Sequence, residues 1–305
     1  AWFHLRERGV FGGVFGILIS LGLYFAFDWC ALIARYTSAE WVFWIPAGLL
    51  ALFCLIVWIF VRDTPVEAGF REIETGDNEQ TAINQLHNSF IDFLRSIFTV
   101  GRGLLKNYII LTIAMVEFCS GYIRSALIDW YAIFKVQTGI NNFIAMNWGL
   151  VQCCAGIAGG MLAGIVSDYF FQSRRGPVAS ILYGVVFIGS ATMWLFIEHD
   201  FMISITVTLM MLSIIGVHGM LSGAASMDFG GKQNVGIVVG IIDGLVYLGQ
   251  GVQYLILGHI VPSDKLAGSA ANWIAWPLAM MPVAFMGWVL STSIWKAFPT
   301  TQAKR

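Results

Sequence analysis

Arg124 is the residue whose type and position most directly indicate chemistry, because it interrupts a long apolar stretch in the segment GYIRSALIDW. A guanidinium group is planar, permanently charged and matched to two oxygen atoms of a phosphate or a carboxylate. Arg124 could therefore bind an anionic ligand. It could equally form a structural ion pair with Glu117, which lies seven residues earlier and on about the same side of a helix. The residues alone leave both interpretations open.

Two carboxylates, Glu117 and Asp243, also lie well inside apolar stretches. Ionisable residues at such positions often mark ion or proton pathways in membrane proteins. Each of the two is therefore predicted either to couple transport to a cation or to be a hydrogen-bonded packing residue, and Glu117 is also a candidate counter-charge for Arg124. His218 is interpreted as a hydrogen-bonded core histidine.

A third charged group lies in the segment GIVSDYFFQSRRG, residues 164–176, where an apolar stretch ends. Asp168 is followed there by Arg174 and Arg175. A carboxylate close to an arginine pair can form a charge-assisted contact that is broken and remade between two conformations. These three residues are therefore predicted to form a gate on the cytoplasmic side.

Other kinds of chemistry lack the residues that they need. The five cysteines lie in apolar runs without a CxxC pair, and the five histidines are scattered among different segments. We therefore expect no metal site, no cofactor and no enzyme active site. The formal net charge of −1 gives no basic excess, so we expect no nucleic acid partner.

The composition predicts that helices in a lipid bilayer position these residues. Of the 305 residues, 58% are apolar and 11% are charged, with a mean hydropathy of +0.75, whereas a soluble domain carries about 25% charged residues. A water-soluble globular protein is thus excluded. A bilayer core of about 30 Å requires roughly 20 apolar residues as helix. This criterion predicts an all-α integral membrane protein with eight spans, at about 10–30, 41–61, 108–133, 142–166, 178–197, 201–225, 235–260 and 271–295.

The connections between these spans predict an orientation and a domain organisation. Thirteen lysines and arginines lie on the side that holds both chain ends and three on the opposite side, so both ends are predicted to be cytoplasmic. The long connection at 62–107 is predicted to be a cytoplasmic linker with an amphipathic helix. It separates two helices in 1–61 from a six-helix bundle in 108–297, and 298–305 is predicted as a cytoplasmic tail. Since the chain begins at Ala1 and two spans alone resemble the end of a bundle, we expect it to be a fragment.

Five segments resemble the major facilitator superfamily and, within it, the organophosphate:phosphate antiporter family. In the order in which that family has them, they are RERG (6–9), RDTPVEAG (62–69), RSALIDW (124–130), AGIAGGMLAGIVSD with RRG (155–176) and, more weakly, GLVYLG (244–249). The resemblance implies a twelve-helix fold of which the eight spans are helices five to twelve, without the first four. It also implies a monomeric secondary transporter in the cell (inner) membrane.

The same resemblance implies a substrate and a mechanism. Family members exchange an organic phosphate, such as glycerol-3-phosphate or a sugar phosphate, for inorganic phosphate by rocker-switch alternating access. Arg124 matches an arginine of the family that binds the phosphate, and Tyr247 matches a tyrosine that lines the cavity. These matches favour substrate binding as the role of Arg124.

Three positions depart from the family pattern. Ile19 stands where the family usually has a histidine, Cys153 where it has a glutamate, and Asp243 where it has a small neutral residue. These departures keep open a proton-coupled carrier of another organic anion. The resembled family also contains sensors that bind sugar phosphate, so a sugar-phosphate sensor that signals to a membrane kinase is a second alternative.

Overall fold

The computed structural model describes residues 17, 20–62, 65–71, 101–103, 106–225 and 235–297, and the regular structure in these ranges is helical. The chain divides into two compact units, Ala1–Leu86 and His87–Arg305, each of which is described by itself. Most of the predicted linker at 62–107 and the whole predicted tail at 298–305 lie outside the described residues. The amphipathic helix and the domain boundaries therefore stay predictions.

In the first unit, helical residues from Ser20 lead into η1 (Phe25–Trp29) and α2 (Cys30–Tyr36), and a turn leads on to α3 (Trp41–Phe60). α3 buries none of its residues within the unit, although its segment is apolar on every side. This composition is typical of a helix that is surrounded by lipid or by other membrane helices.

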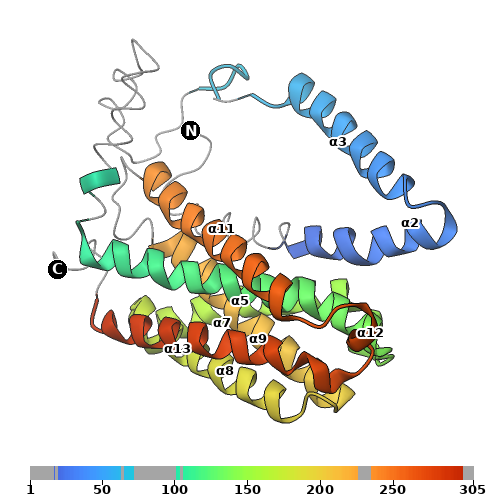
Figure 1. Ribbon diagram of the computed structural model, residues 1–305. Helices are drawn as coiled ribbons and strands as arrows, with labels where there is room; N and C mark the ends of the chain where they lie inside the picture. Colours follow the sequence, from blue (N-terminus) through green and yellow to red (C-terminus); the bar gives the residue numbers. More distant parts are fainter. Residues whose placement is uncertain are drawn as a thin grey trace. The chain divides into compact units, whose positions relative to one another are not determined.

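The second unit is a bundle of long helices with short connecting elements (Figure 1). Its elements in chain order are α5 (Tyr108–Thr138), α6 (Phe143–Met146), α7 (Trp148–Phe170), α8 (Arg175–Leu195), α9 (Asp200–His218), η4 (Gly219–Ala225), α11 (Val235–Ile260), α12 (Asp264–Ala267), η5 (Ala270–Ile274) and α13 (Ala275–Ser293). α5 packs against α11, α13 and α9, α8 packs against α13 and α9, and α7 packs against α9.

Seven helices in the described ranges are long and apolar enough to cross a membrane. Each overlaps one of the predicted spans, so the all-helical, multi-pass membrane fold is confirmed. Of the remaining predicted span, at about 10–30, residues 17 and 20–30 are described and are helical, and the other residues lie outside the described ranges.

α5 is the most buried of the membrane-spanning helices and carries both Glu117 and Arg124. The Asn107 side chain accepts a hydrogen bond from Ile109 N–H at 3.0 Å and so caps the start of the helix. Gly139, with φ of 74°, ends it in the left-handed region that glycine adopts readily. Its 31 residues give a length of about 46 Å, which exceeds the apolar core of a bilayer.

Aromatic side chains from three neighbouring helices fix the position of α5. Trp148 of α7, Tyr183 of α8 and Trp276 of α13 each donate a hydrogen bond to one of its backbone carbonyls, at 3.2, 2.6 and 2.9 Å respectively. A carbonyl oxygen can accept such a bond in addition to its helical one, because it has two lone pairs. The rotation of α5, and hence the direction of Arg124, is set by these contacts.

α5 and α11 approach each other closely at two glycines. A Cβ atom at Gly121 would overlap the Val246 carbonyl, and one at Gly249 would overlap the Phe118 carbonyl. Small residues allow the backbones of membrane helices to come this near. The contact holds α11, which carries Asp243 and Tyr247, directly beside the helix that carries Arg124.

Candidate functional site

Arg124 lies near the middle of α5 and is half-buried, while its neighbours Ile123 and Ser125 are buried. Among the described residues, its guanidinium group makes no hydrogen bond and no ion pair. It does interact favourably with the carboxylate charge of Asp129, five residues further along α5. Arg124 thus retains its hydrogen-bonding capacity for a ligand.

Glu117 contacts His218 instead of Arg124. The Nδ1 atom of His218 lies 2.7 Å from Oε2 of Glu117, whose side chain is fully buried. The Glu117–Arg124 ion pair, one of the two interpretations that the sequence left open, is therefore not formed. His218 is hydrogen-bonded, as the sequence predicted.

A polar face of α11 lies next to Arg124. Asp243, Tyr247, Gln250 and Tyr254 recur at helical spacing, and all four are half-buried or exposed, whereas Val246 and Gln253 on the adjoining side of the helix are buried. The Tyr254 hydroxyl donates to Asp129 Oδ2 at 2.6 Å and accepts from Gln250 Nε2 at 3.1 Å. This face therefore points away from the core of the bundle and meets α5 close to Arg124.

The sequence interpretation missed Tyr254, Gln250 and Asp129 as members of this group. Asp129 precedes a tryptophan near a span end, which suggested only an interfacial position. The polar spacing of four, three and four residues from Asp243 to Tyr254 was available as a signal. Tyr247 lies on the same face, seven residues before Tyr254, or about 10 Å along the helix axis.

Asp243 is tied to the helix that precedes it in the chain. Its Oδ1 atom accepts a hydrogen bond of 2.5 Å from the Ser222 hydroxyl of η4. A carboxylate that accepts a hydroxyl hydrogen bond is stabilised in its place without a cationic partner. The position that distinguishes this chain from the resembled family is thus occupied by a bonded side chain on the polar face.

Asp168 and Arg175 form the contact that the sequence predicted between them. Arg175 Nη1 lies 2.9 Å from Asp168 Oδ1 and also donates to Ser167 Oγ at 3.0 Å. Gln172 and Ser173 turn the chain between α7 and α8 in the left-handed region, with φ of 53° and 61°. Arg174 points its Nε atom at the Phe171 carbonyl at 3.1 Å. The ion pair therefore connects the end of α7 to the start of α8 through Arg175.

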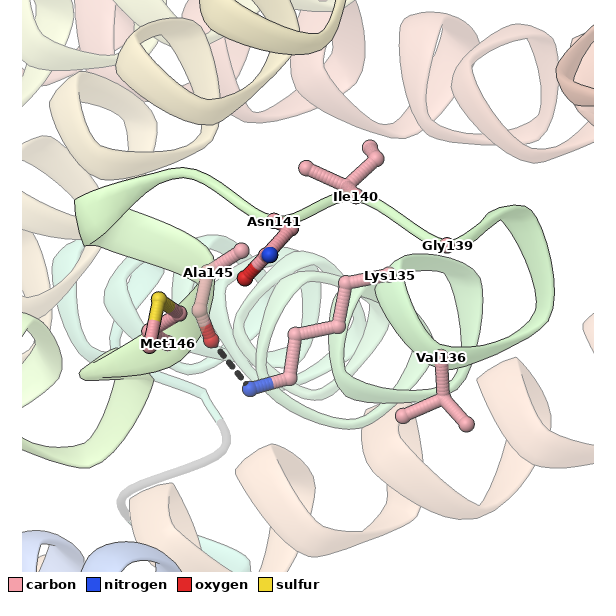
Figure 2. A pocket seen from close by; sticks show the side chains of 7 residues that line it. All are labelled: Lys135, Val136, Gly139, Ile140, Asn141, Ala145 and Met146. Carbon is pink, nitrogen blue, oxygen red and sulfur yellow. Dashed lines mark hydrogen bonds between the residues drawn. The ribbon is translucent and has the colours of Figure 1, made fainter.

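A pocket lies apart from these groups, at the C-terminal end of α5 and around α6 (Figure 2). The Lys135 ammonium donates to the Ala145 carbonyl at 2.5 Å, and Asn141 lies beside it. Lys135 follows Arg124 by eleven residues, which is about 16 Å along the helix. None of the predicted site residues lines this pocket.

These observations define a class of protein: a multi-pass helical membrane protein with a half-buried cationic group on one helix and a polar face on the helix packed against it. The chain belongs to the Major Facilitator Superfamily, whose family description matches residues 1–253. The resemblance found in the sequence motifs is thereby confirmed at the level of the superfamily.

Three relatives of the chain are named as transporters of phosphorylated molecules. The chain is 24% identical over 278 residues to the glycerol-3-phosphate transporter of Bacillus subtilis (strain 168), covering 85% of this chain and 59% of that protein. It is 24% identical over 281 residues to the phosphoglycerate transporter protein of Salmonella typhimurium, covering 87% and 58%. It is 21% identical over 307 residues to the probable hexose phosphate transport protein of Chlamydia trachomatis, covering 97% and 65%. The chain thus spans about three fifths of the length of these relatives.

Proposed function

We propose that the protein is a secondary transporter that carries an organic phosphate across the cell membrane in exchange for inorganic phosphate. The three relatives described above are named for phosphorylated substrates, and phosphate is the anion that best matches an arginine fork. The observation that carries the proposal is that Arg124 makes no ion pair within the described residues, although a carboxylate lies seven residues away on the same helix.

In this proposal the substrate phosphate binds Arg124, and Tyr247 lines the same cavity from α11. An arginine inside a membrane bundle is unfavourable by at least about 2.5 kcal/mol on insertion scales. A ligand that supplies two anionic oxygens compensates this unfavourable term when it binds. The polar face of α11 provides further hydrogen-bonding groups along the path.

We further propose that the eight predicted spans correspond to helices five to twelve of the superfamily fold, and that transport proceeds by rocker-switch alternating access. Under that arrangement the substrate site lies between two helix bundles near the middle of the membrane. The ion pair of Asp168 with Arg175 then acts as a cytoplasmic gate that opens and closes with the cycle.

The proposal is tested by substituting Arg124 with lysine, which keeps the charge and removes the planar fork. The protein is reconstituted in vesicles loaded with inorganic phosphate, and uptake of radiolabelled glycerol-3-phosphate and of glucose-6-phosphate is measured. Charge-assisted hydrogen bonds contribute roughly 1.5–3 kcal/mol, so Arg124→Lys is expected to weaken half-saturation by about 10- to 100-fold.

The control variant is Arg35→Lys, because Arg35 is exposed on α2. It is expected to transport as the unmodified protein does. Equal uptake by the two variants would remove Arg124 from the substrate site. Binding of either phosphate ester by the unmodified protein without flux would instead indicate a receptor.

A further inference from the structure

Asp243 of α11 and Arg124 of α5 carry opposite charges on two helices that pack against each other, and neither forms an ion pair in the described part of the chain. The one hydrogen bond of Asp243 there runs from the Ser222 hydroxyl to Oδ1, at 2.5 Å. Both charged side chains are half-buried, so a ligand can reach them. Charged residues inside a membrane bundle are unfavourable unless a partner or a ligand binds them.

The contacts between α5 and α11 determine how far apart the two charges lie. The two close approaches at glycine and the hydrogen bond of Tyr254 to Asp129 align the helices, and Arg124 then lies level with residues 249–252 of α11. It follows Asp243 by six to nine residues of α11, or roughly 9–14 Å along the axis. This separation exceeds the distance of about 4 Å that defines an ion pair, and it leaves room for a ligand between the two groups.

The neighbouring helices supply no counter-charge for Asp243 among the residues that the structure describes. The His218 imidazole, which precedes η4 in the chain, contacts Glu117 at 2.7 Å. Arg175 of α8 pairs with Asp168, and α13 carries no titratable residue. The carboxylate of Asp243 therefore retains one oxygen, Oδ2, with which to bind a cationic group of a ligand.

The segment that holds Asp243 in place is a π-helix. η4 begins directly after His218, the last residue of α9, and Ser222 lies within it. Wide helical turns of this type occur frequently at functional sites. Because the Ser222 hydroxyl bonds Oδ1, the carboxylate has a fixed direction on the polar face of α11. A side chain that is already ordered loses less conformational entropy when a ligand binds.

We propose that the substrate is a phosphate ester that also carries an ammonium group, with its phosphate on Arg124 and its ammonium on Asp243. This inference rests on the proposed function and narrows the organic phosphate to an amino-alcohol or amino-sugar phosphate. Two charge-assisted contacts of about 3 Å each leave roughly 3–8 Å between the phosphate oxygens and the ammonium nitrogen. A short aminoalkyl chain or an amino sugar spans that distance. No covalent bond is made or broken.

Two pairs of ligands test the proposal, because the members of each pair differ only in an amino or a hydroxyl group at one carbon. They are glucosamine-6-phosphate with glucose-6-phosphate, and ethanolamine phosphate with 2-hydroxyethyl phosphate. Isothermal titration calorimetry measures the binding of each to the purified full-length protein. In at least one pair the amino ester is expected to bind about 10-fold more tightly, as for a hydrogen bond between charged groups. Equal binding within both pairs, or tighter binding of the hydroxyl esters, would overturn the proposal.

The substitution Asp243→Asn tests the residue, because it keeps the shape of the side chain and removes its charge. The preference for the amino ester is expected to fall to about 1, through weaker binding of the amino ester alone. Glu198→Gln is the matched control, since Glu198 is an exposed carboxylate, and it should keep the full preference. A preference that persists in Asp243→Asn would assign the ammonium to another group and contradict the proposal. If Asp243→Asn does not insert, the ligand pairs with the unmodified protein still decide.

Exchange in vesicles loaded with inorganic phosphate separates this inference from the proposed function. A protein that exchanges glycerol-3-phosphate or glucose-6-phosphate and shows no preference for an amino ester keeps the proposed function and loses the inference. A protein that prefers the amino esters in calorimetry and exchanges none of them has the ammonium site and is not a carrier. Binding of no phosphate ester at all would contradict both.

Discussion

The ion pair of Asp168 with Arg175 connects the end of α7 to the start of α8 and is weak enough to break. The Arg175 side chain is 13% exposed and that of Asp168 is 59% exposed, with 2.9 Å between Nη1 and Oδ1. An ion pair this exposed contributes only about 0.2–1 kcal/mol, because water and salt screen it. A contact of that strength biases the turn between α7 and α8 and can still break, as the proposed cytoplasmic gate requires.

At this scale we predict that Asp168→Asn loosens the turn between α7 and α8. Loss of the charge removes up to about 1 kcal/mol, so amide hydrogen exchange over residues 167–176 should accelerate by up to about fivefold. Hydrogen exchange with mass spectrometric detection measures this directly.

The matched control is Ser173→Ala, which removes the hydrogen bond of 2.9 Å to Asp168 and leaves the ion pair in place. If the two variants exchanged equally fast, the charge of Asp168 would not be what holds the turn.

The contact between helices α5 and α11 determines how the residues of the candidate site are arranged. Three aromatic hydrogen bonds set the rotation of α5, and two glycines allow α11 to approach it. Tyr254 and Asp129 can meet only when both conditions hold. The polar face beside Arg124 is therefore a product of helix packing.

We predict that Gly249→Ala destabilises the protein, because the new Cβ would overlap the Phe118 carbonyl. Overpacking of this kind costs about 1–3 kcal/mol. The thermal midpoint in detergent should fall, and glycerol-3-phosphate binding should weaken with it.

Gly251→Ala is the control on the same helix, since a Cβ there meets no atom within 4 Å. Alanine favours helix over glycine by up to about 1 kcal/mol, so this variant should be unchanged or more stable. Equal losses of stability in both variants would show that the α5–α11 contact is not close-packed.

The sequence predicted features that depend on one segment of the chain, and it missed contacts between side chains on different helices. The spans and the unusual position of Arg124 follow from runs of apolar residues along the chain. The partner of Glu117 does not, because His218 lies 101 residues away on another helix. Spacing along one helix suggested Arg124 instead, since it reports only neighbours on the same helix. Pairs between helices, such as Asp129 with Tyr254, depend on rotations that tertiary packing sets.

At the scale of the whole molecule, the distribution of basic residues predicts how the chain sits in its membrane. With the eight predicted spans, thirteen lysines and arginines are predicted to lie on the side that holds both chain ends and three on the opposite side. Such asymmetry sets orientation during insertion. With both chain ends predicted to be cytoplasmic, the exposed loop at Asn141, between α5 and α6, is predicted to lie outside the cell.

We predict that an epitope tag after Arg305 is reached by antibody only in inside-out vesicles, and that a tag inserted at Asn141 is reached only in right-side-out vesicles. Labelling of intact and permeabilised cells with both tags measures this. The reverse pattern would invert the orientation and would place the Asp168–Arg175 contact on the external side.

The wide turn of η4 makes the chain length between His218 and Ser222 critical. An ordinary α-helix rotates by about 100° per residue, and a π-helical turn takes up one residue more than that pitch allows. Deleting one residue between His218 and Ser222 would restore the regular helical pitch. One of the two side chains would then rotate away from the carboxylate that it contacts. A homologous chain with a regular helix here can therefore keep only one of these two contacts, His218 with Glu117 or Ser222 with Asp243. A gap of a single residue at this place in an alignment would identify such chains.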